Sequence, residues 1–144
     1  WVVAGEGPLR AEIERQCEES GLETRVHLLG HIPEPVRLIA DADVYVMSSN
    51  QEGLGTSVLD AMALGIPVAS TAAGGLPELL IDGSGLLVPP GDSAALADAV
   101  HHIVTDPALG AALIGRAGIA VQRFTARRMA DDMVTVYRSC ASFP

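Results

Sequence analysis

The sequence predicts an α/β fold: a Rossmann-like parallel sheet with helices on both faces and a helical C-terminal tail. Short apolar runs alternate with segments of helical periodicity, which is typical of βαβ units. The apolar runs are continuous rather than alternating, as in strands that are covered on both faces. Beyond residue 92 only helical patterns follow. These observations favour a doubly wound sheet followed by helices.

The strands are short runs rich in Val, Leu and Ile, which favour extended structure. They are expected at 1–5, 25–30, 43–49, 67–71 and 84–90. Parallel strands need a crossover between them, and a helical segment follows most of these runs.

The helices are delimited by proline, glycine and capping residues. They are expected at 8–21, 34–42, 57–64, and in three segments from 92 to the end. Pro8 stands at the first position of the first helix, and Gly21 stands at its end. Asp92 or Ser93 caps the first helix of the tail.

Composition limits the classes of partner and compartment. The 144 residues, 49% of them apolar, suit one domain with a buried core. The net charge of −9 argues against nucleic acid or an anionic membrane surface, and all nine basic residues are Arg. Two cysteines without a motif fit a reducing, cytoplasmic setting. The longest apolar run is too short for a transmembrane segment. The chain opens in a strand-like run without Met, so we expect a preceding segment.

The stretch "NQEGLGTSVLDAMALGIPVAST" carries the strongest chemical signal. Gly53 and Gly55 clear room before a helix whose first N–H groups and dipole favour an anion, such as a diphosphate. Glu52 would repel a phosphate but would accept hydrogen bonds from hydroxyl groups. Together these features predict a phosphate ester that also carries sugar hydroxyls.

Structural alternatives apply to the same residues. Ser57 and Asp60 fit a capping box, [ST]-x-x-[DE], which would only close the helix end. Glu52 would then be a solvated surface residue. The later "GGLPE" is explained by a turn with Pro77 at a helix start, or by a role in shaping the pocket. "GEGP" is a strand-end turn or lies near the nucleotide. From the residues alone these alternatives stay open.

The quoted motifs together resemble family 4 retaining glycosyltransferases of the GT-B fold. The resemblance rests on "EGLGTSVLDAMALGIPVAST" and "AAGGLPELL", and extends to "VVAGEGPLR", "RVHLLGHIPEP" and "GLLVPPGDSAALADAV". It implies that residues 1–144 are a single C-terminal, nucleotide-sugar-binding domain that lacks its first strand. The acceptor would bind mainly to an N-terminal Rossmann-like domain outside this chain.

The resemblance assigns roles to individual residues. Glu52 matches the catalytic carboxylate beside the donor sugar. Asp60 stands where the family has the Glu that binds the ribose, and is one methylene shorter. The loop and helix start near the sugar and diphosphate are matched by Gly53, Leu54, Gly55, Thr56, Ser57 and Val58. The loop that meets the base, mostly through its backbone, is matched by Gly30, His31 and Ile32.

The implied activity is transfer of a sugar from a nucleotide diphosphate sugar to an acceptor, with retention of configuration. No metal or other cofactor is expected, because the nucleotide sugar is a substrate and GT-B enzymes of the kind that the chain resembles do not need a metal for the chemistry. The family's phosphate-binding Arg and Lys have no counterpart here, so the isolated chain is expected to be inactive. Localisation is expected to be cytoplasmic, with peripheral membrane attachment through the other domain left open. A sugar-nucleotide epimerase domain and a non-catalytic nucleotide-sugar-binding module remain alternatives.

The resemblance also makes a topological prediction. In the Rossmann strand order the first strand lies between the second and fourth. Residues 1–5 and 43–49 match those two, so the sheet would have a vacant place. We expect "WVVA" to pair in parallel with "RVHLL". The vacant place is filled either by direct pairing of "WVVA" with "VYVM", which we favour, or by another chain.

Overall fold

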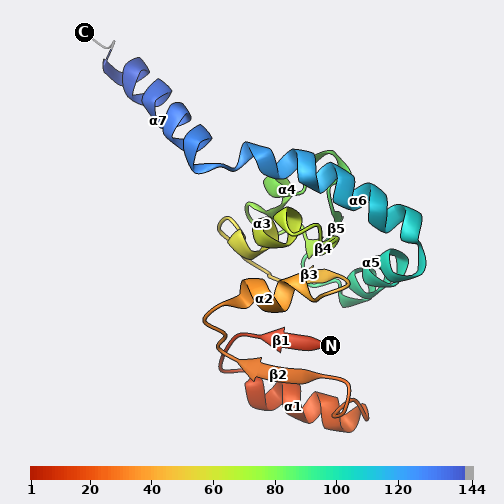
Figure 1. Ribbon diagram of the computed structural model, residues 1–144. Coiled ribbons are helices and arrows are strands. Elements are labelled where there is room, and N and C mark those ends of the chain that lie inside the picture. Colours follow the sequence, from red (N-terminus) through yellow and green to blue (C-terminus); the bar gives the residue numbers. More distant parts are fainter. Residues whose placement is uncertain (142–144) are drawn as a thin grey trace. The chain divides into compact units, whose positions relative to one another are not determined.

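The computed structural model describes residues 1–141, and the chain forms two compact units, Trp1–Arg37 and Leu38–Pro144. Figure 1 follows the elements along the chain. All five predicted strands form, each shorter than its apolar run, and every sheet pairing is parallel. The predicted α/β class is therefore confirmed.

The first unit contains β1 (Val2–Ala4), α1 (Arg10–Glu19) and β2 (His27–Gly30). The two strands pair in parallel, with Val2 opposite His27 and a register shift after Val3. This is the predicted pairing of "WVVA" with "RVHLL". The helix begins at Arg10 rather than at Pro8, and it buries none of its residues.

The predicted direct pairing of "WVVA" with "VYVM" is wrong. β1 and β3 belong to different sheets, one of order β1-β2 and one of order β3-β4-β5. We expected the pairing because buried backbone groups without partners are costly. All three residues of β1 are exposed, however, Val2 by 50% and Val3 by 41%. The expectation that this strand edge is buried is therefore not met.

The second unit carries the remaining elements. In chain order they are α2 (Pro35–Ala40, which starts in the first unit), β3 (Tyr45–Met47), α3 (Thr56–Ala63), β4 (Val68–Thr71), α4 (Leu76–Leu79), η1 (Ile81–Gly83), β5 (Leu86–Val88), α5 (Ser93–Thr105), α6 (Pro107–Ala120), η2 (Val121–Arg123) and α7 (Ala126–Ala141). β4 is the middle strand of its sheet and all its residues are buried.

Helices cover both faces of this sheet, and β4 contributes to two separate cores. Val68 packs with buried residues of α3, α4 and α6. Its neighbour Ala69 points the other way and packs with buried residues of α5 and with Leu113 of α6. Successive strand residues face opposite sides of a sheet, so this alternation is that of a doubly wound unit. The sheet and α3 are thereby fixed on both sides.

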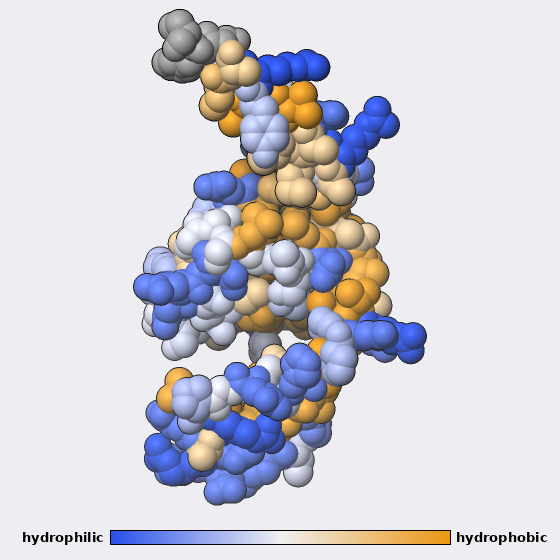
Figure 2. Space-filling view, turned by 90° about the vertical axis from the view of Figure 1, so that its left-hand side faces the viewer, coloured by the Kyte–Doolittle hydropathy of each residue, from blue (hydrophilic) through white to orange (hydrophobic). Residues whose placement is uncertain are grey.

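The tail is helical, as predicted. Asp92, one of the two predicted caps, accepts a hydrogen bond from Ala95 N at 2.9 Å and begins α5. α7 buries none of its residues, and Figure 2 shows apolar and charged surface next to each other along it. Among the helices of residues 1–141, none alone has the length and apolarity of a membrane span; only the bent pair Ser93–Thr105 and Pro107–Arg123 reaches both.

Candidate functional site

The predicted donor loop lies between β3 and α3, at the carboxyl end of the strand. α3 begins at Thr56, and its N-cap is Gly55, with a φ of 72° and no capping side chain. Val58 N donates to Gly55 O at 2.9 Å. Thr56 and Ser57 lie in the first turn, where backbone N–H groups lack intrahelical acceptors. The helix start can therefore donate hydrogen bonds to an anion, as predicted.

Glu52 is tied to its own loop and is half-buried. Its Oε1 accepts from Gly53 N at 3.0 Å, and its Oε2 accepts from Ser49 Oγ at 3.4 Å. The carbonyl of Ser49 in turn accepts from Thr71 Oγ1, a buried side chain of β4, at 2.6 Å. The carboxylate is thus connected to the middle strand of the sheet, which disfavours the interpretation of Glu52 as a freely solvated residue.

Two glycines of the "GGLPE" segment hold the donor loop by backbone contact. Gly75 N lies 3.3 Å from Glu52 O and 3.2 Å from Gly53 O. A Cβ on Gly74 would come within 1.8 Å of Glu52 O, and one on Gly75 within 2.3 Å of Gly53 O. Pro77 lies in the first turn of α4, as predicted. The segment is therefore both a helix start and a support for the loop that carries Glu52.

Asp60 does not act in a capping box. The N-cap is Gly55, so Ser57 lies inside α3 and cannot cap it. The Asp60 carboxylate is half-buried, and within residues 1–141 it accepts no hydrogen bond. This removes the structural alternative that the capping pattern offered and leaves the carboxylate available to a ligand.

Sequence reasoning missed Tyr45 as a residue of this region. Its hydroxyl donates to Ser57 Oγ at 2.8 Å. Burial raises the pKa of Tyr45, the hydrogen bond with Ser57 opposes this rise, and the carboxylates of Asp60 and Glu52 add to it. One phenol therefore lies in the field of both predicted carboxylates. The available signal was a hydroxyl-bearing side chain inside an otherwise apolar strand.

The predicted base-contacting residues lie in the first unit. Gly30 is buried, has a φ of 72°, and its carbonyl accepts from Gly5 N at 2.8 Å. His31 is exposed, and its backbone N–H donates to Glu6 Oε1 at 3.3 Å. Ile32 is half-buried. Because the carboxylate of Glu6 occupies the N–H of His31, a base would have to displace it or use neighbouring backbone groups.

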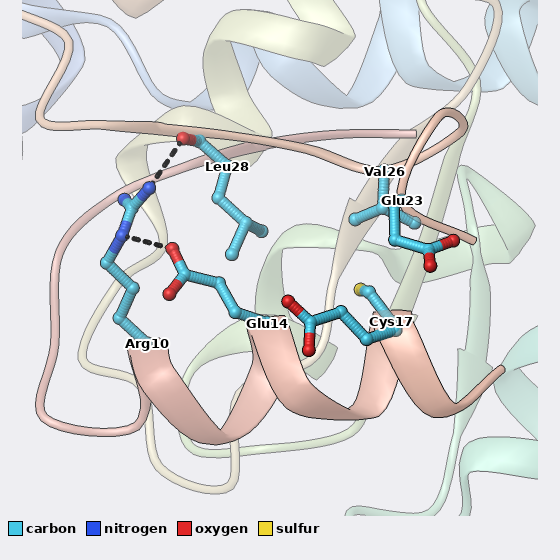
Figure 3. Close-up of a pocket in the computed structure, with 7 residues that line it drawn as sticks. Arg10, Glu14, Cys17, Glu23, Val26 and Leu28 are labelled. Atoms are coloured by element: carbon cyan, nitrogen blue, oxygen red, sulfur yellow. Dashed lines mark hydrogen bonds and ion pairs between the residues drawn. The ribbon is translucent and has the colours of Figure 1, made fainter. Parts of the chain in front are cut away.

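A hollow between α1 and β2 is a separate feature of the first unit (Figure 3). Arg10 spans its rim, bonded to Glu14 Oε1 at 2.8 Å and to Leu28 O at 3.1 Å. Its other lining residues are Cys17, Glu18, Glu23 and Val26. None of the predicted site residues lines it, and its carboxylates would repel a diphosphate. In residues 1–141, no three His, Cys, Asp or Glu side chains gather as metal ligands would.

Comparison with known proteins agrees with these motifs. The 2-deoxystreptamine N-acetyl-D-glucosaminyltransferase of Streptomyces fradiae is 41% identical over 111 residues, covering 74% of this chain and 26% of that protein. The putative glycosyltransferase EpsD of Bacillus subtilis is 34% identical over 137 residues, covering 94% of this chain and 36% of that protein.

Solved structures show the same fold. Anabaena HepE in complex with UDP-glucose matches with a TM-score of 0.85 and 30% identity, covering 96% of this chain and 40% of that chain. Sucrose-phosphate synthase of Thermosynechococcus elongatus matches with a TM-score of 0.82 and 34% identity, over 98% of this chain and 38% of that chain. This chain thus spans less than half the length of each of these proteins. The family model described as glycosyl transferases group 1 matches residues 1–106, and this chain therefore belongs to that family.

Proposed function

We propose that this chain supplies part of the donor site of a retaining glycosyltransferase that uses a nucleotide diphosphate sugar. The observation that carries the proposal is the placement of two carboxylates near the uncapped start of α3, with Glu52 in the loop before the N-cap and Asp60 in the second turn of the helix. That start offers N–H donors for phosphate, while the two carboxylates accept hydrogen bonds from sugar hydroxyls. The UDP-glucose complex of a structural relative supports the same class of ligand.

In this proposal each part of the loop has its own task. The N–H groups of Thr56 and Ser57 bind the diphosphate, and Asp60 accepts from the ribose hydroxyls. Glu52 faces the donor sugar. Because the Asp60 carboxylate accepts no hydrogen bond within residues 1–141, ribose hydroxyls would give it its first. Gly74 and Gly75 fix the loop by contact with the carbonyls of Glu52 and Gly53.

The reaction we propose is a front-face substitution. The bond between the anomeric carbon and the diphosphate oxygen breaks, and the acceptor oxygen attacks from the same side. The acceptor proton passes to the departing phosphate oxygen, and the configuration is retained. The chain's contribution is to position the donor and to stabilise charge on the leaving diphosphate.

The charge balance indicates what the complete enzyme adds. Glu52 and Asp60 bring two negative charges close to a diphosphate, and only helix N–H groups offset them here. We infer that cationic side chains from the rest of the enzyme complete the phosphate site, with no requirement for a metal ion. The acceptor site lies in the other domain.

The test is a thermal-shift panel of UDP-, GDP- and ADP-sugars on the complete enzyme, followed by turnover with the stabilising donor. We expect one base to raise the melting temperature and the anomeric configuration of the product, read by NMR, to match the donor. Conversion of the free nucleotide sugar into its epimer would favour the epimerase alternative. Binding without turnover or epimerisation would favour a non-catalytic module, and an inverted product would overturn retention.

A further inference from the structure

Tyr45 connects the edge strand of the second unit to the start of α3. Its Oη lies 2.8 Å from Ser57 Oγ. A phenol is more acidic than an aliphatic alcohol and is therefore the better donor, so Tyr45 donates and Ser57 accepts. Ser57 lies in the first helical turn, beside the N–H groups assigned to the diphosphate.

The hydrogen of Ser57 itself remains available. A serine within a helix often donates to the carbonyl four residues earlier, which here is Gly53 O. Within residues 1–141, Ser57 Oγ donates neither to that carbonyl, which accepts from Gly75 N, nor to any other acceptor. With its oxygen engaged by Tyr45, the Ser57 hydroxyl has a restricted set of orientations.

We propose that Tyr45 is a positioning residue that fixes the Ser57 hydroxyl so that its hydrogen is donated to the diphosphate of the donor. The inference rests on the proposed function and deepens it, because it adds a side-chain donor to the backbone donors of the helix start. Such a donor also offsets part of the repulsion from Glu52 and Asp60.

The electrostatic environment of Tyr45 is consistent with the protonated form that this role requires. Burial and the carboxylates of Asp60 and Glu52 raise its pKa, although the bond to Ser57 opposes the rise. An ordinary phenol is already protonated at neutral pH, and the raised pKa of Tyr45 moves its ionisation further from that range, so the hydroxyl remains a donor. A phenolate could only accept, and it would turn the hydrogen of Ser57 away from the ligand.

The experiment is a double-mutant cycle on the complete enzyme, using calorimetry with the nucleoside diphosphate found in the panel and with its parent nucleoside. Tyr45→Phe should raise the Kd for the diphosphate about 3- to 10-fold, and Ser57→Ala about 10-fold. The double variant should be no weaker than Ser57→Ala alone. The Kd for the nucleoside should not change. Ser57→Thr, which keeps the hydroxyl, should recover most of the affinity that Ser57→Ala loses.

Tyr137→Phe on exposed α7 is the matched control, and it should leave both Kd values unchanged. Equal weakening of diphosphate and nucleoside binding in Tyr45→Phe, or independent effects of the two substitutions, would overturn the inference. If the wild type binds the diphosphate and Tyr45→Phe binds it equally well, only this inference fails. If the wild type binds no nucleotide, the proposed function fails with it. If Tyr45→Phe does not fold, Ser57→Ala provides the test. Equal affinity of Ser57→Ala and wild type for the diphosphate would refute the role of the Ser57 hydroxyl, and with it that of Tyr45.

Discussion

The two units hold their parts of the predicted site in different ways. In the first unit only Gly30 is buried, and the loop around His31 is held by hydrogen bonds among exposed groups. In the second unit the loop around Glu52 is bonded to buried Thr71 and pressed against Gly74. A core-anchored loop can hold a carboxylate in one geometry, while an exposed loop can adjust to its ligand.

This contrast predicts where substitutions have large consequences. Changes around Glu52 should alter folding and turnover because close packing allows little relaxation. Substitutions around His31 should have small effects on folding and turnover, because water replaces lost hydrogen bonds on an exposed loop.

The largest effect is expected from Gly74→Ala. Its Cβ would lie 1.8 Å from the carbonyl oxygen of Glu52, and its φ is 53°. Backbone must move to relieve the overlap, so unfolding free energy should fall by about 2–4 kcal/mol and turnover of the complete enzyme should fall with it. Urea unfolding of the variant measures the first effect.

Gly115→Ala in α6 is the matched control, because nothing lies within 4 Å of its added Cβ. It should stabilise the protein by about 0.5–1 kcal/mol through helix propensity. Equal stability of Gly74→Ala and wild type would mean that the two loops are not in contact.

Glu52→Gln tests the carboxylate that the core-anchored loop presents. If it faces the donor sugar, turnover of the complete enzyme should fall on the order of 10- to 1000-fold while the Kd for the nucleoside diphosphate changes little. Steady-state kinetics and calorimetry separate these effects. Exposed Glu12→Gln on α1 serves as a charge-matched control. Turnover of Glu52→Gln within twofold of wild type would refute the assignment.

Asp60→Ala separates ligand binding from helix stability. Capping would predict a loss of about 1 kcal/mol in unfolding free energy. Because Gly55 is the N-cap, we expect stability to change little and the Kd for the nucleoside diphosphate to rise about tenfold. Asp60→Glu should retain or improve affinity. Melting curves and calorimetry on both variants distinguish ligand binding from helix capping. A severe loss of affinity in Asp60→Glu would mean that the local backbone has adapted to Asp.

The sequence was sufficient for the features set by local pattern. Continuous apolar runs located all five strands, and Asp92 was a recognisable cap. The segment "EGLGTS" located the loop that leads into α3, because glycine and helix-start chemistry are read along the chain. The first helix was placed two residues early, since Pro8 also suits the turn that precedes it.

The features that the sequence did not predict depend on contacts across the fold. The bond from Tyr45 to Ser57 joins residues that are twelve apart, and only the packing of α3 on β3 brings them together. The same holds for Gly75 against the carbonyl of Glu52. The separate sheet of β1 was missed because solvation of its edge depends on how much of the strand is buried, which no local pattern contains.

The smallest effect, and the test of the first unit, is expected from Glu6→Ala. Glu6 Oε1 accepts the N–H of His31 at 3.3 Å on an exposed surface, so its loss should change unfolding free energy by less than about 0.5 kcal/mol. If the base meets the backbone of this loop, the substitution frees one donor and removes one negative charge. The Kd for the parent nucleoside should then fall about twofold to threefold in the complete enzyme. Glu6→Gln keeps an acceptor oxygen, so it should change the Kd for the nucleoside less than Glu6→Ala does. Nucleoside affinity weakened by tenfold in Glu6→Ala would show instead that Glu6 itself binds the ligand, and a large loss of stability would mean that the first unit is held more tightly than its exposure indicates.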